Sequence, residues 1–456
     1  MIPYAILAGQ YFEKDSNIAT EDFRILELSP ETFIFRTAEP LVHPEEGEFL
    51  LHFFSFRGQR WENVCLKPEN FTIQEAEASA EAAEAFYTTY RVKTSFRDFE
   101  EKAAKLSAEY LHYISLKWEG DDAALSQALT GYPAELEGRF ADCWEQQKEE
   151  LFSNLQAESG WQEAYESFPR LALQLDRPSL WQAYLHQPLR EFMRAYWKQN
   201  NLEKHPIRHR LPDSLCIGNQ FCRHLFPKKE ELAAIRRKAQ EEGLQILLYL
   251  SPTAEEQMEE RKHFLREQAR MAADKEEKTE LVINDLGLLH FLQEELPGSF
   301  VITLGSLLNK YRRDVRMQWK KGYDRNQKSE NAFSTDFYPA RLCGIGAAGW
   351  LLEASAPLPK ISAEGKSSLI FPFYQMNTAG YCTLYAACKN LSRGRQEYVK
   401  SCPGYCEGNC FLYPQALGMV GRYNTLFGFH AKILQRADLL REMREEKVER
   451  LILQLL

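Results

Sequence analysis

The chain has 456 residues, a formal net charge of −9, and 44% hydrophobic and 12% aromatic residues. A chain of this length is expected to form two or three domains, and its composition excludes wholesale disorder. The acidic balance argues against DNA binding, because a phosphate backbone calls for a net basic face, although it leaves a local basic patch open.

The first residues give no sign of export or of membrane insertion. Their apolar run is broken within about ten residues and lacks a preceding basic segment, so it is too short for a secretion signal or a membrane span. We therefore expect a cytoplasmic protein without membrane association. In that reducing compartment the ten cysteines are expected to be thiols or metal ligands rather than disulfides.

Residues 20–95 contain short β-prone runs separated by Pro, Glu and Gly, among them TFIFRT, FLLHFFSF, ENVCLKP and FYTTYRVKT. This pattern predicts a small antiparallel β-barrel or sandwich. An amphipathic helix follows, because apolar residues recur at steps of three and four. They are Phe99, Ala103, Leu106, Tyr110 and Ile114. The predicted first domain, a β-barrel-like domain with a closing helix, spans residues 1–118.

Residues 119–205 are Trp-rich and are predicted to form a helical connector. From residue 206 to 456, apolar strands alternate with helices, which is typical of βα units around a parallel sheet. The predicted strands are SLCIGN, LQILLYL, TELVIND, SFVITLG, RLCGIG and SSLIFPFY. About six such repeats without a glycine-rich phosphate loop favour a TIM-like (β/α) barrel, so the fold class is α/β.

The functional face of such a barrel lies at the C-terminal ends of its strands. We therefore expect side chains that are far apart in the sequence to meet on one rim. They are Asn219 and Cys222 after the first predicted strand, Asn284 and Asp285 after the third, Asn309 and Lys310 after the fourth, and Cys382 with the later cysteines after the sixth.

Three cysteines, Cys402, Cys406 and Cys410, stand four residues apart. With Cys222, Cys382 and Cys388 they offer six thiols for four metal positions. A 4Fe–4S cluster needs four thiolates and tolerates irregular spacing, whereas structural zinc usually uses C-x2-C knuckles. The repeated C-x3-C spacing therefore favours the cluster, with zinc and plain buried thiols as the alternatives.

Five segments carry a resemblance to a known family. They are SLCIGNQFCRHLFP, ELVINDLGLLHFL, LGSLLNKYRRDVRM, NTAGYC and CEGNCFLYP. In this order, over residues 210–430, they resemble the collagenase-like peptidase family of unknown catalytic type, family 32. The likeness is nearest to its iron–sulfur branch of oxygen-independent ubiquinone hydroxylation, and it implies a bacterial protein that works anaerobically.

The resemblance implies that a 4Fe–4S cluster is held by Cys222, Cys382, Cys406 and Cys410. This chain departs from the family pattern by its additional thiols. Cys388 is an alternative to Cys382, and Cys402 is an alternative to Cys410.

The implied reaction is oxygen-independent hydroxylation or modification of RNA or of a small molecule. Because four thiolates leave no open coordination position, electron transfer or a structural role is the simpler use of the cluster. The alternatives are a peptidase, for which no protease motif is present, and a zinc-stabilised module that binds a protein partner.

Other residues carry weaker signals. His224 is a candidate rim residue but is more simply a structural hydrogen-bonding group. Asp285 is either part of the site or the cap of the next helix. The basic segment 309–328 is either an RNA-binding or anion-binding surface or a solvated helix face.

The isolated cysteines are expected to be structural core residues, because lone cysteines are usually buried. They are Cys65, Cys143, Cys216 and Cys343. The first domain is faintly similar to a degenerate PilZ domain at Glu27, Leu28 and Ser29, but it lacks the arginine pair that binds cyclic di-GMP. A structural or partner-docking role is therefore expected there.

Overall fold

A computed structural model describes residues 6–16, 19–20, 22–58, 60–75, 87–273, 278–311, 329–361, 365–413 and 415–455. The chain divides into two compact units. One is built mainly from the first 134 residues and the other mainly from the remainder. Among the described helices, none is both long and apolar enough to cross a membrane.

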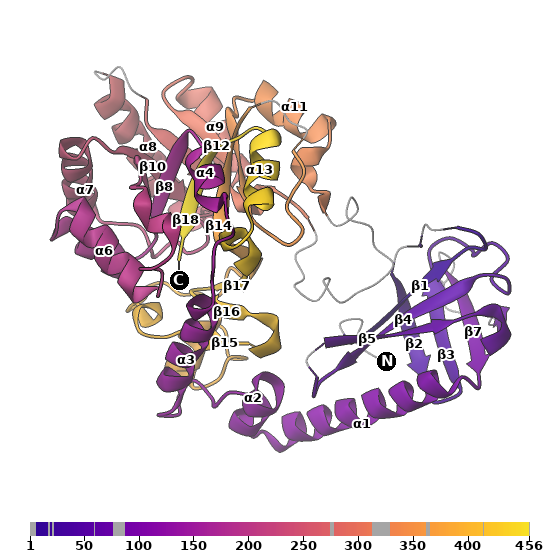
Figure 1. Cartoon of the computed structure of the whole chain (residues 1–456). Helices are drawn as coiled ribbons and strands as arrows, with labels where there is room; N and C mark the ends of the chain where they lie inside the picture. Colours follow the sequence, from indigo (N-terminus) through magenta and orange to yellow (C-terminus); the bar gives the residue numbers. More distant parts are fainter. Residues whose placement is uncertain are drawn as a thin grey trace. The chain divides into compact units, whose positions relative to one another are not determined.

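The first unit is an antiparallel half-barrel of seven strands in the order β5-β4-β1-β2-β3-β7-β6 (Figure 1). The strands are β1 (Leu7–Phe12), β2 (Phe23–Leu28), β3 (Thr32–Thr37), β4 (Glu48–Ser55), β5 (Arg60–Leu66), β6 (Phe71–Glu75) and β7 (Thr88–Thr94). Helix α1 (Arg97–Glu119) and the short α2 (Asp122–Thr130) follow. Phe99, Ala103 and Leu106 of α1 join the aromatic core of the sheet, which confirms the predicted amphipathic helix.

The second unit contains a closed barrel of eight parallel strands in chain order, which makes it TIM-like. The strands are β8 (Arg170–Leu175), β9 (Ser214–Ile217), β10 (Gln245–Leu250), β11 (Glu280–Ile283), β12 (Val301–Leu304), β13 (Gly349–Glu353), β14 (Lys366–Thr378) and β18 (Val448–Gln454). β18 closes the ring by pairing with both β8 and β14.

This unit also contains helices, most of which lie around the barrel strands (Figure 1). They are α3 (Phe140–Ser153), α4 (Trp161–Glu166), α5 (Pro178–Leu185), α6 (Leu189–Gln199), α7 (Lys229–Glu241), α8 (Met258–Ala273), α9 (Leu286–Glu295), α11 (Phe337–Gly344), α12 (Thr383–Asn390) and α13 (Ala437–Glu445). No described helix separates β13 from β14, so the alternation is incomplete at that step.

The structure corrects the predicted elements in three places. Residues 119–205, expected to be wholly helical, contain the first barrel strand, β8, together with α5 and α6. A single buried strand of six residues between helices has no periodicity that separates it from a helix. The predicted strand RLCGIG instead lies at the end of α11, with the true strand β13 just after it, and β18 was not predicted.

The middle of the barrel is filled by apolar side chains from seven of its strands. Cys216 belongs to this layer and is fully buried, which confirms its expected structural place. Burial raises the pKa of this thiol to about 12. Cys216 is therefore a neutral core residue at physiological pH.

Strand β14 is long enough to leave the barrel. Its first half pairs in parallel with β13 and β18, and its second half pairs antiparallel with β17 (Thr425–Phe429). β17 continues the sheet to β16 (Met419–Arg422) and β15 (Phe411–Leu412). This extension starts at the C-terminal end of β14, so it carries the cysteine-rich segment to the rim where functional residues of such barrels gather.

Candidate functional site

Hydrogen bonds join the cysteine-rich segment to the loop after β9. Asn424 Nδ2, in the turn between β16 and β17, donates to the Phe221 carbonyl at 2.9 Å. The ring nitrogen His224 Nε2 lies 3.0 Å from the Val399 carbonyl oxygen, and Arg223 donates to the same carbonyl and to the Tyr398 hydroxyl. These bonds fix the loop that carries Cys222 against the loop that precedes Cys402.

Several thiols lie near one another at this junction. Burial raises the pKa of Cys222 to about 12, and the neighbouring thiols of Cys382 and Cys402 raise it further. Burial also raises the pKa of Cys406, with Cys222 and Cys402 among its neighbours, and that of Cys382, with both Cys402 and Cys388 nearby. Cys402 thus acts on each of the other three thiols.

Cys410 has different surroundings. Burial raises its pKa to about 12, and the charged groups that act on it are Arg422, Glu145 and Lys148, with no cysteine among them. Cys406 lies within the 3-10 turn Tyr405–Glu407, whereas Cys410 lies beyond it, directly before β15. These neighbours favour the alternative quartet, in which Cys402 stands in place of Cys410.

Backbone N–H groups surround three of the four sulfur atoms. Tyr385 N lies 3.4 Å from Cys382 Sγ and Gly404 N lies 3.4 Å from Cys402 Sγ, while the backbone of His224 lowers the pKa of Cys222 against the larger effect of burial. Such donors favour the thiolate over the thiol. They also tune the electronic properties of sulfur-bound metal centres.

Among the described residues, no three His, Cys, Asp or Glu side chains converge closely enough to hold a metal ion. Zinc would need four ligands around one atom, whereas in a 4Fe–4S cluster each thiolate binds its own iron atom. The thiols of this region offer the donor type that either group needs.

A buried charged group that the sequence did not reveal lies beside the quartet. Asp176 and Arg177 follow β8 directly, and Arg177 Nη1 donates to Asp176 Oδ1 at 3.0 Å. The hydroxyl of Tyr423 donates to Asp176 Oδ2 at 2.6 Å, and Arg422 Nε and Nη2 each lie 3.3 Å from the Cys406 carbonyl oxygen. These bonds connect the end of the first barrel strand to Arg422 and Tyr423. Those two residues in turn contact Cys406 and Cys382.

Buried amides line the same end of the barrel. Gln174 on β8 and Gln454 on β18 each lie two residues after an apolar residue of the barrel interior, Ala172 and Ile452 respectively. Both glutamines are almost fully buried. Gln220 reaches across the mouth, where its Oε1 accepts from Ser306 N at 3.1 Å. Within the described part of the chain, both side-chain polar atoms of Gln174 and the Nε2 atoms of Gln220 and Gln454 have no hydrogen-bond partner.

Buried polar atoms without partners usually mark water or a ligand. A buried carboxylate accompanies these amides. Glu353, at the end of β13, accepts from Gln375 N at 2.8 Å and from the Tyr311 hydroxyl at 3.1 Å. The mouth of the barrel therefore presents hydrogen-bond donors and acceptors together with one negative charge.

Three predicted rim residues turn out to have structural roles. Asp285 caps α9, since its Oδ1 accepts from Gly287 N and Leu288 N and its Oδ2 from Thr253 N. Asn284 Oδ1 accepts from Leu307 N at 3.0 Å and Asn219 Oδ1 accepts from Cys222 N at 2.9 Å. These side chains hold the rim loops in place, and both oxygens of Asp285 are occupied by backbone donors.

The expected burial of the lone cysteines is wrong for three of the four. Cys65 and Cys343 are exposed and Cys143 is half-buried. The general tendency of cysteine to be buried does not hold here, because these residues lie on the outer side of β5, α11 and α3.

Of the predicted basic segment 309–328, residues 312–328 lie outside the described residues. Ser29 lies in the turn between β2 and β3, where its hydroxyl donates to the Thr32 carbonyl.

No family model, curated protein or solved structure matches this chain.

Proposed function

We propose that this chain is an iron–sulfur protein whose TIM-like barrel carries a 4Fe–4S cluster on Cys222, Cys382, Cys402 and Cys406. The observation that carries the proposal is the set of hydrogen bonds that joins the loops of these thiols: Asn424 to the Phe221 carbonyl, Arg223 to the Val399 carbonyl and Cys382 Sγ to the Tyr423 carbonyl. In agreement with it, Cys402 raises the pKa of each of the other three thiols. The backbone donors to Cys382 and Cys402 support it, because they favour the thiolates that iron requires.

The reaction class that we propose is oxygen-independent hydroxylation or modification of RNA or of a small molecule. When bound, the cluster supplies one-electron transfer. The protein would supply the groups that bind the substrate and accept a proton. The buried amides Gln174, Gln220 and Gln454 would bind and orient a polar substrate at the mouth of the barrel, and Glu353 would accept a hydrogen bond or a proton there.

Contacts between the thiol-bearing segment and the barrel mouth support this reaction class. Gln174 is on β8 and Asp176 follows the strand two residues later, and Asp176 is hydrogen-bonded to Tyr423, whose carbonyl accepts from Cys382 Sγ at 3.2 Å. One short path of contacts therefore joins the thiol loop to the amide-lined mouth. This proximity is what a redox reaction on a bound substrate requires.

The test is a metal analysis with an absorption spectrum, on full-length protein purified without oxygen. The proposal predicts iron together with acid-labile sulfide, and a broad band near ~400 nm that bleaches in air. Zinc as the sole metal, with a colourless and air-insensitive protein, would instead support a zinc-stabilised binding module. Hydrolysis of gelatin by protein that lacks iron would support the peptidase alternative.

A further inference from the structure

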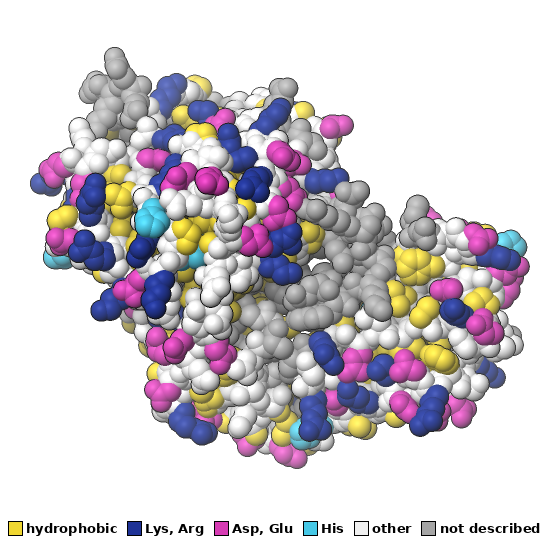
Figure 2. Space-filling view, in the orientation of Figure 1, with side chains coloured by type: hydrophobic (Ala, Val, Ile, Leu, Met, Phe, Trp, Pro, Cys, Tyr) yellow, Lys and Arg dark blue, Asp and Glu magenta, His cyan; other side chains and the backbone are white. Residues whose placement is uncertain are grey.

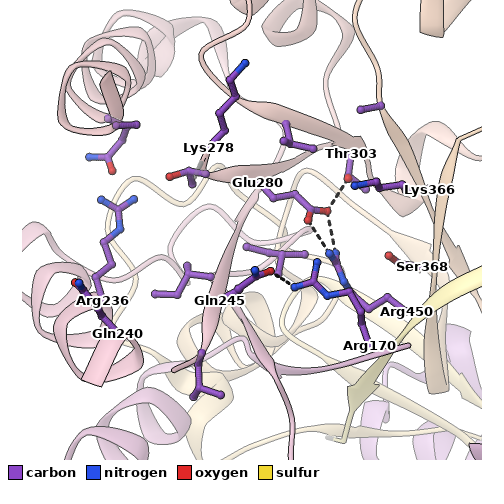
Figure 3. A pocket seen from close by; sticks show the side chains of 18 of the residues that line it. Arg170, Arg236, Gln240, Gln245, Lys278, Glu280, Thr303, Lys366, Ser368 and Arg450 are labelled. Carbon is purple, nitrogen blue, oxygen red and sulfur yellow. Dashed lines mark hydrogen bonds and ion pairs between the residues drawn. The ribbon is translucent and has the colours of Figure 1, made fainter. Parts of the chain in front are cut away.

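A large cavity of the barrel unit lies at the opposite end from the cysteines. Its volume is about 1150 Å³, and it is lined by the first residues of several barrel strands and by α7 (Figure 3). Arg170 opens β8, Gln245 opens β10 and Lys366 opens β14. The N-terminal ends of the strands therefore form its floor, whereas Cys382 and the other thiols follow the C-terminal ends.

The lining of this cavity is strongly basic. Six of its side chains are basic and two, Glu280 and Glu449, are acidic. The basic residues are Arg170, Arg236, Arg237, Lys278, Lys366 and Arg450. The chain as a whole has a net charge of −9, and on the face drawn in Figure 2 basic and acidic side chains are intermingled. The excess of positive charge is therefore a local property of this cavity.

Only part of this positive charge is neutralised within the described residues. Arg450 forms two hydrogen bonds with Glu280, Nη1 to Oε1 at 2.9 Å and Nη2 to Oε2 at 2.8 Å. Arg170 Nε lies 3.7 Å from Asp213 Oδ1, and Arg170 also donates to Gln245. Glu280 is thereby committed to Arg450, and Thr303 donates to the same carboxylate at 2.7 Å (Figure 3).

Arg236 differs from Arg450 and Arg170 in its surroundings. Its Nη2 is buried with no hydrogen-bond partner among the described residues. Burial lowers the pKa of Arg236, and no carboxylate acts to raise it. An arginine nevertheless stays charged in proteins, so the wall of the cavity holds a partly desolvated guanidinium whose charge is not balanced.

We propose that this cavity binds a small anion that carries more than one phosphate group. Arg236 lies on one side of the cavity, Lys278 on another, and Arg170 and Lys366 stand across from Arg236 (Figure 3). Positive groups on several sides suit a ligand with separated charges better than a single carboxylate. The planar donors of Arg236 match a phosphate, and the lysines add further positive charge. This site is independent of the cluster.

The test is calorimetric titration of the full-length protein with pyrophosphate at low salt. The proposal predicts saturable binding that weakens as salt is added, and a Kd about tenfold weaker in Arg236→Gln, the loss of one charge-assisted hydrogen bond. Lys366→Gln, at an exposed position on the cavity rim, is expected to weaken binding without affecting the fold. The matched control is Arg194→Gln, which removes an exposed positive charge on α6, outside the cavity.

Three outcomes would overturn the proposal. One is no heat of binding with the wild-type protein. Another is equal affinity in the wild type, Arg236→Gln and Lys366→Gln. The third is binding of a single-stranded RNA oligonucleotide that pyrophosphate does not compete away, because the phosphate groups would then belong to a polymer bound elsewhere. Iron content should be the same in all variants, so failure here is distinguishable from failure of the cluster proposal.

Discussion

Tyr423 joins the first strand of the barrel to the cysteine-rich segment through two different atoms. Its hydroxyl donates to Asp176 Oδ2 at 2.6 Å, and its carbonyl accepts from Cys382 Sγ at 3.2 Å. The backbone of Tyr423 has a φ of 58°, in the left-handed region that bulky residues rarely occupy. The surrounding contacts must therefore hold a conformation that the residue would not adopt alone.

Replacing Tyr423 by Phe removes one donor from a fully buried carboxylate and leaves the backbone and ring in place. We expect the free energy of unfolding to fall by about 1–3 kcal/mol, the cost of an unsatisfied buried acceptor. Urea denaturation followed by tryptophan fluorescence measures this change. Tyr381→Phe is the control, because Tyr381 is 48% exposed and should give no measurable effect. Equal stabilities for both variants would show that the bond to Asp176 contributes nothing.

Glu280 and Arg450 form the paired charges at the other end of the barrel. Burial opposes ionisation of Glu280, but the hydrogen bonds from Arg450 outweigh it and lower the pKa of the carboxyl. A lowered folded-state pKa adds stability that is present above the unfolded value, near ~4.3, and is lost as the pH falls through the folded pKa.

Glu280→Gln should therefore lower the free energy of unfolding by about 3–5 kcal/mol at pH 7, because Arg450 is left buried without its counter-charge. The difference from the wild type should shrink as the pH falls below ~4, where the wild-type carboxyl is also becoming neutral. Urea denaturation at a series of pH values measures this. Glu294→Gln, on the exposed surface of α9, is the control. A difference that does not change with pH would contradict the assigned charge on Glu280.

Removing the cluster should loosen the cysteine-rich segment but not the barrel. Residues 391–404 contain no helix or strand, and the bonds from Arg223 and His224 to the Val399 carbonyl are their main attachment to the β9 loop. Hydrogen exchange in these residues should rise after exposure to air and a chelator, while β9 and β10 stay protected. Unchanged exchange in residues 391–404 would mean that the thiols do not share a cluster that pins this loop.

The sequence predicted the barrel because five of its eight strands are short apolar runs that alternate with helices. It could not predict β8, which lies among helices and carries no periodic signal of its own. Asp176 and Arg177 follow β8, so these two site residues were missed with it. Tyr423 was missed for another reason, since nothing in its local sequence marks a left-handed tyrosine.

Sequence spacing also cannot choose between Cys402 and Cys410 as a ligand of the proposed cluster. Both stand four residues from Cys406, so spacing treats them alike. The difference arises from the tertiary structure, because Arg422, Glu145 and Lys148 act on Cys410, whereas Cys402 influences the thiols of Cys222, Cys382 and Cys406. The repeated C-x3-C pattern therefore marks the segment of the proposed cluster but does not select its ligands.

The most direct test compares the iron and sulfide contents of the wild type, Cys402→Ser and Cys410→Ser, each purified without oxygen. The account predicts about four irons and about four sulfides per chain in the wild type and in Cys410→Ser, and a large loss of both in Cys402→Ser. Loss in Cys410→Ser with retention in Cys402→Ser would contradict the proposed quartet. A wild-type protein without iron would contradict the cluster itself.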